Sequence, residues 1–251
     1  MKNRNAVCLV TIKPNAHWVD LLRKFQNYDV FVVVDRPTDP ECQDFIQITN
    51  DDCIQNGYIH SSYMPTTALA FNEIIAWDRA LFYFTNVRTE YDNVWFFEDD
   101  VFFYGESTIL NVDKKYKNSD ILCKEKNPEP REDEWNWFWP AISINFPGPY
   151  FHSQICAVRM SRRMLSYIDE YVKKPHNRKL FFIEAMFPSI AHHHGLVYDM
   201  PTELNEIHWR RDWTANDMNH ATFFHPMKNM DQHREFRELL ALKTDTEGKL
   251  I

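Results

Sequence analysis

The pattern of apolar positions in the first hundred residues predicts strands that alternate with helices. Residues 6–12 form one apolar run and residues 30–34 form another, while residues 18–25 between them carry apolar side chains at helical spacing. Residues 69–84 repeat the helical spacing and lead into an apolar strand over residues 93–98. Strands joined through helices pair in parallel, and the helices cover both faces of the sheet.

The second half of the chain adds further elements of both kinds. We expect a strand over 150–158, a helix after the capping residue Ser161 with its apolar face ending at Val172, a helix over 180–194, short strands at 207–209 and 222–224, and a charged helix over 230–242. Between residues 124 and 147 the pattern is lost, which indicates a loop or an insertion. The whole order predicts a single α/β domain with a mostly parallel central sheet and helices on both faces.

Composition narrows the classes of function. The chain has 251 residues, of which 44% are apolar, and this is enough to bury a sizeable core. A net charge of −8 and a pI near 5.8 provide no field that attracts nucleic acid or an anionic membrane. No apolar run reaches the ~18–20 residues that a membrane-spanning helix needs, so we expect no transmembrane segment.

Cysteine and glycine usage exclude further classes. The five cysteines are scattered and form no Cys-x-x-Cys pair, so their spacing argues against a disulfide framework and a zinc site, and it indicates a reducing compartment. With only five glycines, the chain has neither a Gly-x-Gly-x-x-Gly turn nor a phosphate-binding P-loop. An anionic substrate would therefore be held by a metal ion or by a few basic side chains.

The strand over residues 93–98 ends in three adjacent carboxylates, Glu98, Asp99 and Asp100. Acidic groups this close repel one another and resist removal from water. A divalent cation relieves both penalties, and carboxylates at the carboxyl end of a buried strand suit Mg²⁺ or Mn²⁺ with a phosphorylated substrate. The alternative is a solvated turn with ordinary acidic residues.

This strand and its acidic triplet resemble the Asp-x-Asp type motif of GT-A glycosyltransferases, which use nucleotide-diphosphate sugars. The resemblance implies a Rossmann-like GT-A fold. It implies a nucleotide-binding half over about residues 1–105, an acceptor and catalytic half over about 106–230, and a C-terminal helix over about 230–243. It also implies a UDP- or GDP-sugar as donor and a glycan as acceptor.

The resemblance extends to the metal ligands. It implies that Asp100 and Glu98 bind Mn²⁺ or Mg²⁺, with Asp99 also on the cofactor side. A later His-Pro-x-Lys sequence, from His225 to Lys228, is similar to a segment that some family members use near the metal. Imidazole with carboxylate suits Mn²⁺, and the lysine ammonium can neutralise a diphosphate. The alternative for His225 is a structural histidine.

Three residues at the ends of the first two strands, and one on the helix before the acidic strand, are candidates for donor contacts. By the same resemblance, Thr11, Lys13 and Asp35 would touch the nucleoside, since a strand-end carboxylate can accept hydrogen bonds from ribose and base. Asp35 is alternatively a turn residue before a proline. Arg79 is a candidate phosphate contact, with surface ion pairing as its alternative.

Glu184 is the candidate general base. It lies among Phe, Ile, Ala and Met, and desolvation there should raise its pKa toward the value needed to take a proton from a sugar hydroxyl. Inverting family members carry an acid on a helix at this point of the chain. The alternative is a glutamate on a helix surface. A base at this position implies transfer by direct displacement, with inversion and no covalent intermediate.

An aromatic run in the unpatterned segment is the candidate acceptor platform. Trp135, Trp137 and Trp139 alternate with Asn and Phe, and flat aromatic faces beside polar groups commonly bind sugar rings. The alternative is that the segment folds back and buries these rings against the sheet.

The sequence thus predicts a metal-dependent, inverting hexosyl- or pentosyltransferase. The small soluble glycosyltransferases of large algal DNA viruses look similar, which implies a location in the cytoplasm, that of the host if the chain is viral. Clustered carboxylates and histidines also suit a metal-dependent nucleotidyltransferase or phosphohydrolase. A glycan-binding module is the non-enzymatic alternative.

Overall fold

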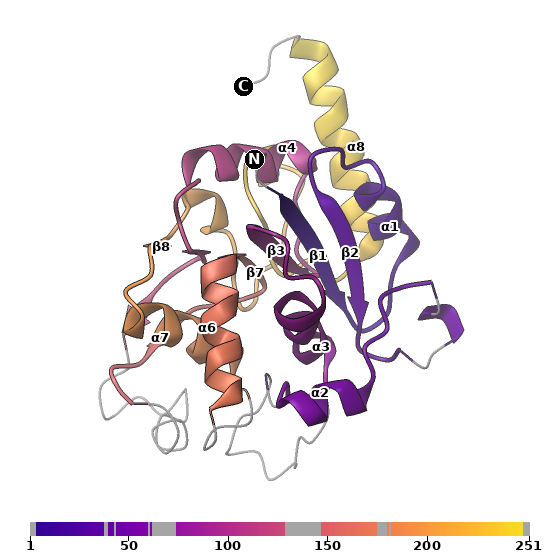
Figure 1. Cartoon of the computed structure of the whole chain (residues 1–251). Coiled ribbons are helices and arrows are strands. Elements are labelled where there is room, and N and C mark those ends of the chain that lie inside the picture. Colours follow the sequence, from indigo (N-terminus) through magenta and orange to yellow (C-terminus); the bar gives the residue numbers. More distant parts are fainter. Residues whose placement is uncertain are drawn as a thin grey trace.

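The computed structural model of the chain describes residues 4–37, 40–42, 44–59, 61, 74–128, 147–174, 180 and 182–247 (Figure 1). At its centre lies a six-stranded sheet in the order β2-β1-β3-β7-β4-β8. Its strands are β1 (Asn5–Thr11), β2 (Asp29–Val34), β3 (Asn93–Glu98), β4 (Ile121–Leu122), β7 (Ala157–Ser161) and β8 (Tyr198–Asp199). Only β7 pairs antiparallel with its neighbours, so the prediction of a mostly parallel sheet is confirmed.

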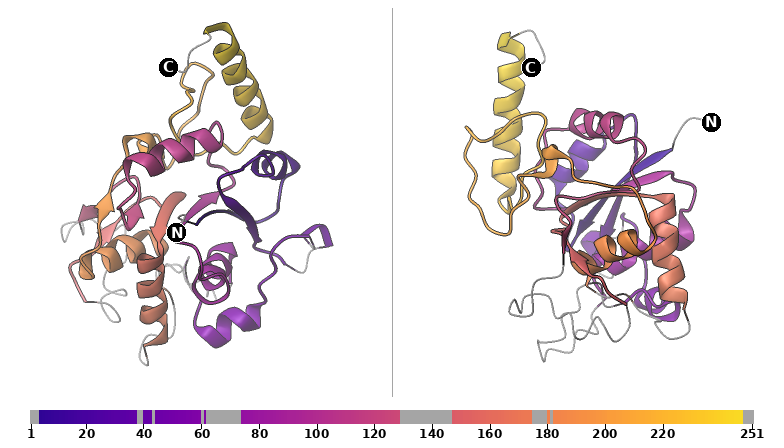
Figure 2. Two further views of the ribbon diagram at one scale, coloured as in Figure 1. Left: turned by 45° about the horizontal axis from the view of Figure 1, so that its top comes forward. Right: turned by 90° about the vertical axis from the view of Figure 1, so that its left-hand side faces the viewer.

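Helices cover both faces of this sheet, as the sequence predicts (Figures 1 and 2). The described α-helices are α1 (Ala16–Leu22), α2 (Asn50–Asn56), α3 (Ala76–Phe82), α4 (Glu106–Lys115), α6 (Arg162–Lys173), α7 (Ile183–His193) and α8 (Met230–Glu247). Short helical turns lie at Pro40–Cys42, Tyr83–Val87 and Thr202–Leu204, and β5 (Asn127–Pro128) pairs with β6 (Phe151–His152). One core packs α3, α6 and α7 against the sheet, and a second packs α1 and α4 against the opposite face.

The strand alternation of β3 explains how one strand serves both cores. Val94 and Phe96 belong to the first core, whereas Trp95 and Phe97 belong to the second. All four side chains are at most 1% exposed, so the strand is apolar on both sides, as a central strand covered on both faces must be. The strand then ends at Glu98, where the sheet edge meets solvent and the first carboxylate appears.

An aromatic stack packs the segment around Phe223 against β3. The ring of Phe223 stacks on Trp95 and on Phe97, with ring centroids 5.6 Å apart in each case. Next to it, the backbones of Phe224 and Phe102 exchange two hydrogen bonds of 2.8 Å. These contacts bring the residues after Phe224 to the carboxyl end of β3, although more than a hundred positions separate them in sequence.

A third core lies where α8 meets this late segment. Phe236 and Leu240 of α8 pack with Phe102, Phe224 and Trp213. The helix runs beside α1, and its last turns extend beyond the sheet (Figures 1 and 2). Within the described residues, no helix combines the length and the apolar character that crossing a membrane requires.

We expect Phe223→Ala to destabilise the fold by about 3–5 kcal/mol, because it removes a fully buried ring from the stack and leaves a cavity. Urea unfolding followed by fluorescence measures the loss. Leu242→Ala is the control, since this side chain is 64% exposed and its removal should change stability by less than about 0.5 kcal/mol. Equal unfolding midpoints for the two variants would contradict the structural role of the stack.

Candidate functional site

A cavity of about 820 Å³ opens at the carboxyl end of β3. Its walls come from the approach to α3, the end of β3, the chain before β7, the start of α7 and two late loops. The lining residues are Ser61, Ile75, Trp77, Glu98, Asp100, Ile155, Cys156, Phe182, Ile183, Glu184, Trp209, Arg210, Arg211, Asp212, His225, Pro226 and Lys228. The structure therefore brings together all three predicted metal ligands, the predicted base and the predicted diphosphate lysine.

The three acidic side chains of the triplet point in two directions, two toward the cavity and one toward β1. Glu98 and Asp100 line the cavity, and Glu98 Oε1 accepts a hydrogen bond of 2.8 Å from the indole of Trp77. Asp99 instead lies with its Oδ2 atom 2.5 Å from the hydroxyl of Thr11, at the end of β1. Its backbone carbonyl accepts a hydrogen bond of 2.7 Å from the Trp18 indole. Asp99 thus connects the end of β3 to β1 and α1, while its neighbours face the cavity.

Asp100, which is partly buried, and His225, which is buried, form a pair that is stable only with a positive charge between them. Asp100 Oδ1 is buried without a hydrogen-bond partner of acceptable geometry, and it lies 3.3 Å from His225 Nε2. His225 Nδ1 lies 2.6 Å from the carbonyl oxygen of His208, so this nitrogen carries the hydrogen and donates it. In a neutral ring, the lone pair of Nε2 then faces the carboxylate. Either a second proton or a metal ion removes that repulsion.

The pKa values of this group reflect the same need. Burial lowers the pKa of His225, but the contact with Asp100, the His208 carbonyl and the charge of Glu98 together outweigh it, so the net shift is upward. Burial raises the pKa of Glu98, and the negative charge of Asp100 raises it further. Both shifts mean that the site holds protons when no other cation is present.

The donor types around this pair suit a divalent cation, but its binding would have to draw Asp100 closer to Glu98, because these two and His225 do not form a group at metal-ligand spacing among the described residues. Carboxylate oxygens from Glu98 and Asp100 with one imidazole nitrogen are a set that Mn²⁺ accepts readily and Mg²⁺ accepts with more water. The unpartnered Asp100 oxygen and the Nε2 lone pair are the observations that support the fit. Fixing the other imidazole nitrogen on a backbone carbonyl is a usual feature of metal-binding histidines.

Glu184 lines the same cavity from the start of α7, near enough for the charge of Glu98 to act on it. It lies in the first turn of α7 and is 8% exposed, and the backbone N–H of Ile155 donates to its carboxylate. Burial, with the negative charge of Glu98, raises the pKa of Glu184 to about 8. The sequence predicts this direction from the apolar neighbours. The carboxyl group is therefore poised to exchange a proton near neutral pH.

The raised pKa of Glu184 predicts a dependence of stability on pH. Between pH 4.5 and about 8, the folded protein retains a proton that the unfolded chain has released, so the free energy of unfolding falls as pH rises. Glu184→Gln cannot titrate and should lack this decline. At about pH 8 it should exceed the wild type in stability by on the order of a few kcal/mol. Denaturant unfolding with a chelator, at about pH 5 and pH 8, measures the difference, and parallel curves would contradict the assignment.

Lys228 is exposed and lines the same cavity. Its position is set by the preceding residue, because the backbone N–H of Met227 donates a hydrogen bond of 2.7 Å to the carbonyl of Asp100. The ammonium group can therefore move on its flexible stem while its backbone stays beside the candidate metal ligands.

The predicted nucleoside residues lie at the ends of β1 and β2. Thr11 is buried and is held by Asp99, whereas Lys13 is exposed and its backbone N–H lies 3.2 Å from the Thr11 hydroxyl. Asp35 follows β2, and its backbone N–H donates a hydrogen bond of 2.9 Å to the carbonyl of Thr11. These residues share the sheet edge with the cavity but do not line it.

The surroundings of Arg79 indicate a structural role. It is only 3% exposed and donates to the carbonyls of Ile48 and Ile74 and to the side chain of Asn50. Its Nη1 atom lies 3.7 Å from Asp35 Oδ1. Arg79 is therefore a buried arginine paired with a partly exposed carboxylate. The alternative expectation of a surface pair is replaced by an arginine that holds the chain before α2 and α3 together. The predicted acceptor residues Trp135, Trp137 and Trp139 lie outside the described residues.

Three residues that line the cavity are not predicted as site residues from the sequence. Trp77 follows the apolar period of its helix and therefore reads as core, yet its indole N–H reaches Glu98. Cys156 lies in an apolar strand-like run with no local metal-binding spacing. Trp209 is 67% exposed at the cavity, and an exposed large aromatic is visible only once burial is known.

Comparisons with known proteins leave the function open. No family model matches the sequence, and a search of curated proteins finds no match. Among solved structures, the chain is similar to mouse xyloside xylosyltransferase 1 in its apo form, with a TM-score of 0.42 and 12% sequence identity. The match covers 89% of this chain and 97% of that chain. Similarity at this level is too distant to identify an activity, which has to be inferred from the cavity itself.

Proposed function

We propose that this protein is a glycosyltransferase that moves a hexosyl or pentosyl group from a nucleotide-diphosphate sugar to a hydroxyl acceptor, with the help of a divalent cation. The observation that carries the proposal is one cavity lined by Glu98, Asp100, His225, Glu184 and Lys228. Few reactions need a cation site, a mobile ammonium and a separate carboxyl base together, and transfer from a diphosphate leaving group is one of them.

The cation would be Mn²⁺ or Mg²⁺ held by Asp100, Glu98 and His225. When bound, it supplies positive charge against the negative charge that develops on the departing diphosphate. Lys228 supplies a second positive charge, and its flexible stem allows the ammonium to follow the phosphate oxygens. Both charges act more strongly on the leaving group than on the intact donor, which is what accelerates the reaction.

Glu184 would act as the general base. Its carboxylate takes the proton of the acceptor hydroxyl while that oxygen attacks the anomeric carbon, and the bond from this carbon to the β-phosphate oxygen breaks. The two acids would have separate tasks, with Glu98 in the cation site on β3 and Glu184 on α7 at the same cavity. A single displacement of this kind inverts the anomeric configuration.

The donor nucleoside, UDP or GDP, would lie toward the ends of β1 and β2. Thr11, Lys13 and Asp35 mark that direction, and Asp99 connects it to the cation site through its contact with Thr11. Parallel sheets commonly bind nucleotides at this edge. The glycan acceptor would enter past Trp209, whose exposed ring provides a flat apolar face at the cavity.

The test is incubation with UDP- and GDP-sugars in the presence of Mn²⁺, Mg²⁺ or a chelator, followed by chromatography of the products. We expect slow release of free nucleoside diphosphate and free sugar that depends on the cation. Release of inorganic phosphate or pyrophosphate would instead support a phosphohydrolase or a nucleotidyltransferase. Binding of glycans without any cation and without turnover would support a glycan-binding module.

A further inference from the structure

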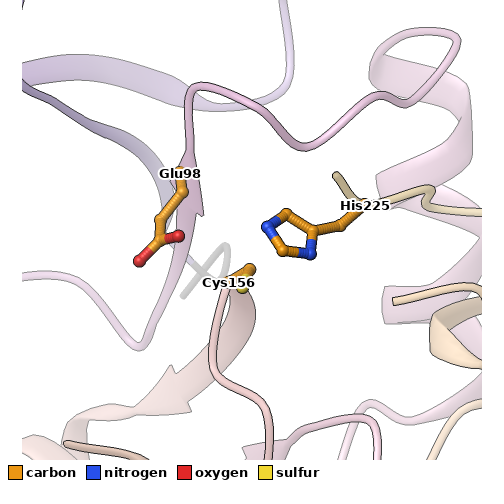
Figure 3. Close-up of side chains that lie close together, drawn as sticks. All are labelled: Glu98, Cys156 and His225. Carbon is orange, nitrogen blue, oxygen red and sulfur yellow. The ribbon is translucent and has the colours of Figure 1, made fainter. Parts of the chain in front are cut away.

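A thiol lies beside the candidate cation ligands. The donor atoms of Glu98, Cys156 and His225 all lie within 4.8 Å of one another (Figure 3). They come from the end of β3, the residue before β7 and the late segment after Phe224. Among the described residues, this is the one group of three potential metal ligands at such spacing. Antiparallel pairing of β3 with β7 explains why Glu98 and Cys156 are neighbours, since the N–H of Glu98 donates a hydrogen bond of 2.9 Å to the carbonyl of Cys156.

We propose that this cavity contains a second mode of cation binding, in which Cys156, Glu98 and His225 bind Zn²⁺ or a similar thiophilic ion. Sulfur, nitrogen and oxygen ligands in a set of three, with an open fourth position, are typical of zinc sites. Bond lengths of about 2.0–2.3 Å place tetrahedral ligands roughly 3.3–3.8 Å apart. Closing the observed group to that separation requires side-chain movements on the order of 1 Å, which rotamer adjustments provide.

Two features prepare the group for a metal. His225 donates from Nδ1 to the carbonyl of His208, which leaves Nε2 as the ligand atom. Cys156 is 7% exposed and lines the cavity, so an ion that enters from solvent can reach its sulfur. A wholly enclosed thiol, such as Cys53 on α2, offers no such access.

Binding exchanges a proton for the ion. Without metal, the Cys156 thiol donates a hydrogen bond to the Glu98 carboxylate. When Zn²⁺ enters, the S–H bond breaks, its electron pair goes to the metal and the proton leaves to solvent. No oxidant or reductant is involved. The positive ion then occupies the space between sulfur and carboxylate that the proton bridged.

The consequence for catalysis rests on the proposed function, whereas ion binding itself does not. Glu98 and His225 belong to both ligand sets, so Zn²⁺ and the hard cation exclude each other. A site with sulfur and nitrogen ligands favours Zn²⁺ over Mn²⁺, as the general affinity order of these metals requires. We therefore expect Zn²⁺ to inhibit sugar transfer in competition with Mn²⁺, and Cys156→Ser to relieve the inhibition.

Co²⁺ provides a direct test, because it replaces Zn²⁺ and shows a thiolate-to-metal charge-transfer band in the near ultraviolet. We expect this band on adding Co²⁺ to the whole protein, its loss in Cys156→Ser, and its retention in Cys53→Ser. Zn²⁺ should abolish the band at concentrations far below those at which Mg²⁺ does. Binding of Co²⁺ without the band, or a band that persists in Cys156→Ser, would overturn the proposal.

A second measurement uses the wild-type protein and avoids any folding defect of the variant. Alkylation of Cys156, followed by peptide mass spectrometry, should be blocked by Zn²⁺ and unaffected by Mg²⁺. Equal labelling with both ions would contradict the proposal. The two proposals fail separately: sugar transfer with Mn²⁺ but no Co²⁺ band removes only the thiolate site, and a band without any transfer removes only the glycosyltransferase.

Discussion

Replacing Glu184 by glutamine should lower the turnover number by roughly 10²–10⁴-fold while the affinity for the nucleotide-sugar donor stays unchanged. The amide matches the carboxyl group in size but cannot accept the proton of the attacking hydroxyl. Donor affinity should persist because Glu184, on α7, is not among the candidate cation ligands and the amide keeps its size and shape. Initial rates of nucleoside diphosphate release with acceptor present, and donor binding by calorimetry, measure the two quantities.

Glu203→Gln is the matched control for this variant. Glu203 is also a buried glutamate, 6% exposed, but it pairs with Lys115 away from the cavity. A general penalty for neutralising a buried acid would appear in both variants. Normal turnover in Glu184→Gln would exclude the base role, and an equal loss in both variants would attribute the effect to folding.

Asp100→Ala should weaken cation-dependent donor binding by more than about 100-fold, since loss of a ligand exceeds the 10–100-fold typical of its supporting hydrogen bonds. Asp100 Oδ1 is a buried oxygen without a hydrogen-bond partner, and its removal leaves His225 Nε2 without its anionic neighbour. Calorimetric titration with Mn²⁺, alone and with nucleoside diphosphate, measures the change.

Asp212→Asn removes the same charge from the same cavity and serves as the control, because its side chain is exposed at the rim. Its Mn²⁺ affinity should stay close to that of the wild type. Similar losses in both variants would show that the general negative potential of the cavity, and not coordination by Asp100, attracts the cation. Unchanged Mn²⁺ binding in Asp100→Ala would remove Asp100 from the ligand set.

The sequence predicts the first half of the fold well. The apolar runs at residues 6–12 and 30–34 correspond to β1 and β2, and residues 93–98 match β3. The direction of a strand is harder to predict from the sequence, because apolar periodicity is identical for parallel and antiparallel strands. The reversal of β7 therefore emerges only from the pairing of Phe97 with Ala157. The short strands predicted at 207–209 and 222–224 appear as single bridges.

The candidate site is predictable as far as local chemistry determines it. The carboxylates after β3, the late histidine and Glu184 stand out because each is polar in an apolar stretch. Cys156 does not, since metal-site rules use spacing along the chain and its partners lie 58 and 69 positions away. Such a group can be recognised only when the sheet order and the aromatic stack of Phe223 are known. The scattered cysteines exclude a zinc site built on a local cysteine pair, whereas Cys156 would bind an ion together with ligands distant in sequence.

The packing of α8 has a further consequence. His225 belongs to a segment wedged between β3 and the C-terminal helix, whose Phe236 and Leu240 share a core with Phe224. A ligand that binds only the folded arrangement stabilises it by mass action, so occupancy at His225 should suppress opening of the distant helix. Hydrogen exchange in residues 233–242 would then slow on adding Mn²⁺. Shortening α8 would, by the same linkage, weaken affinity for an ion that it never touches.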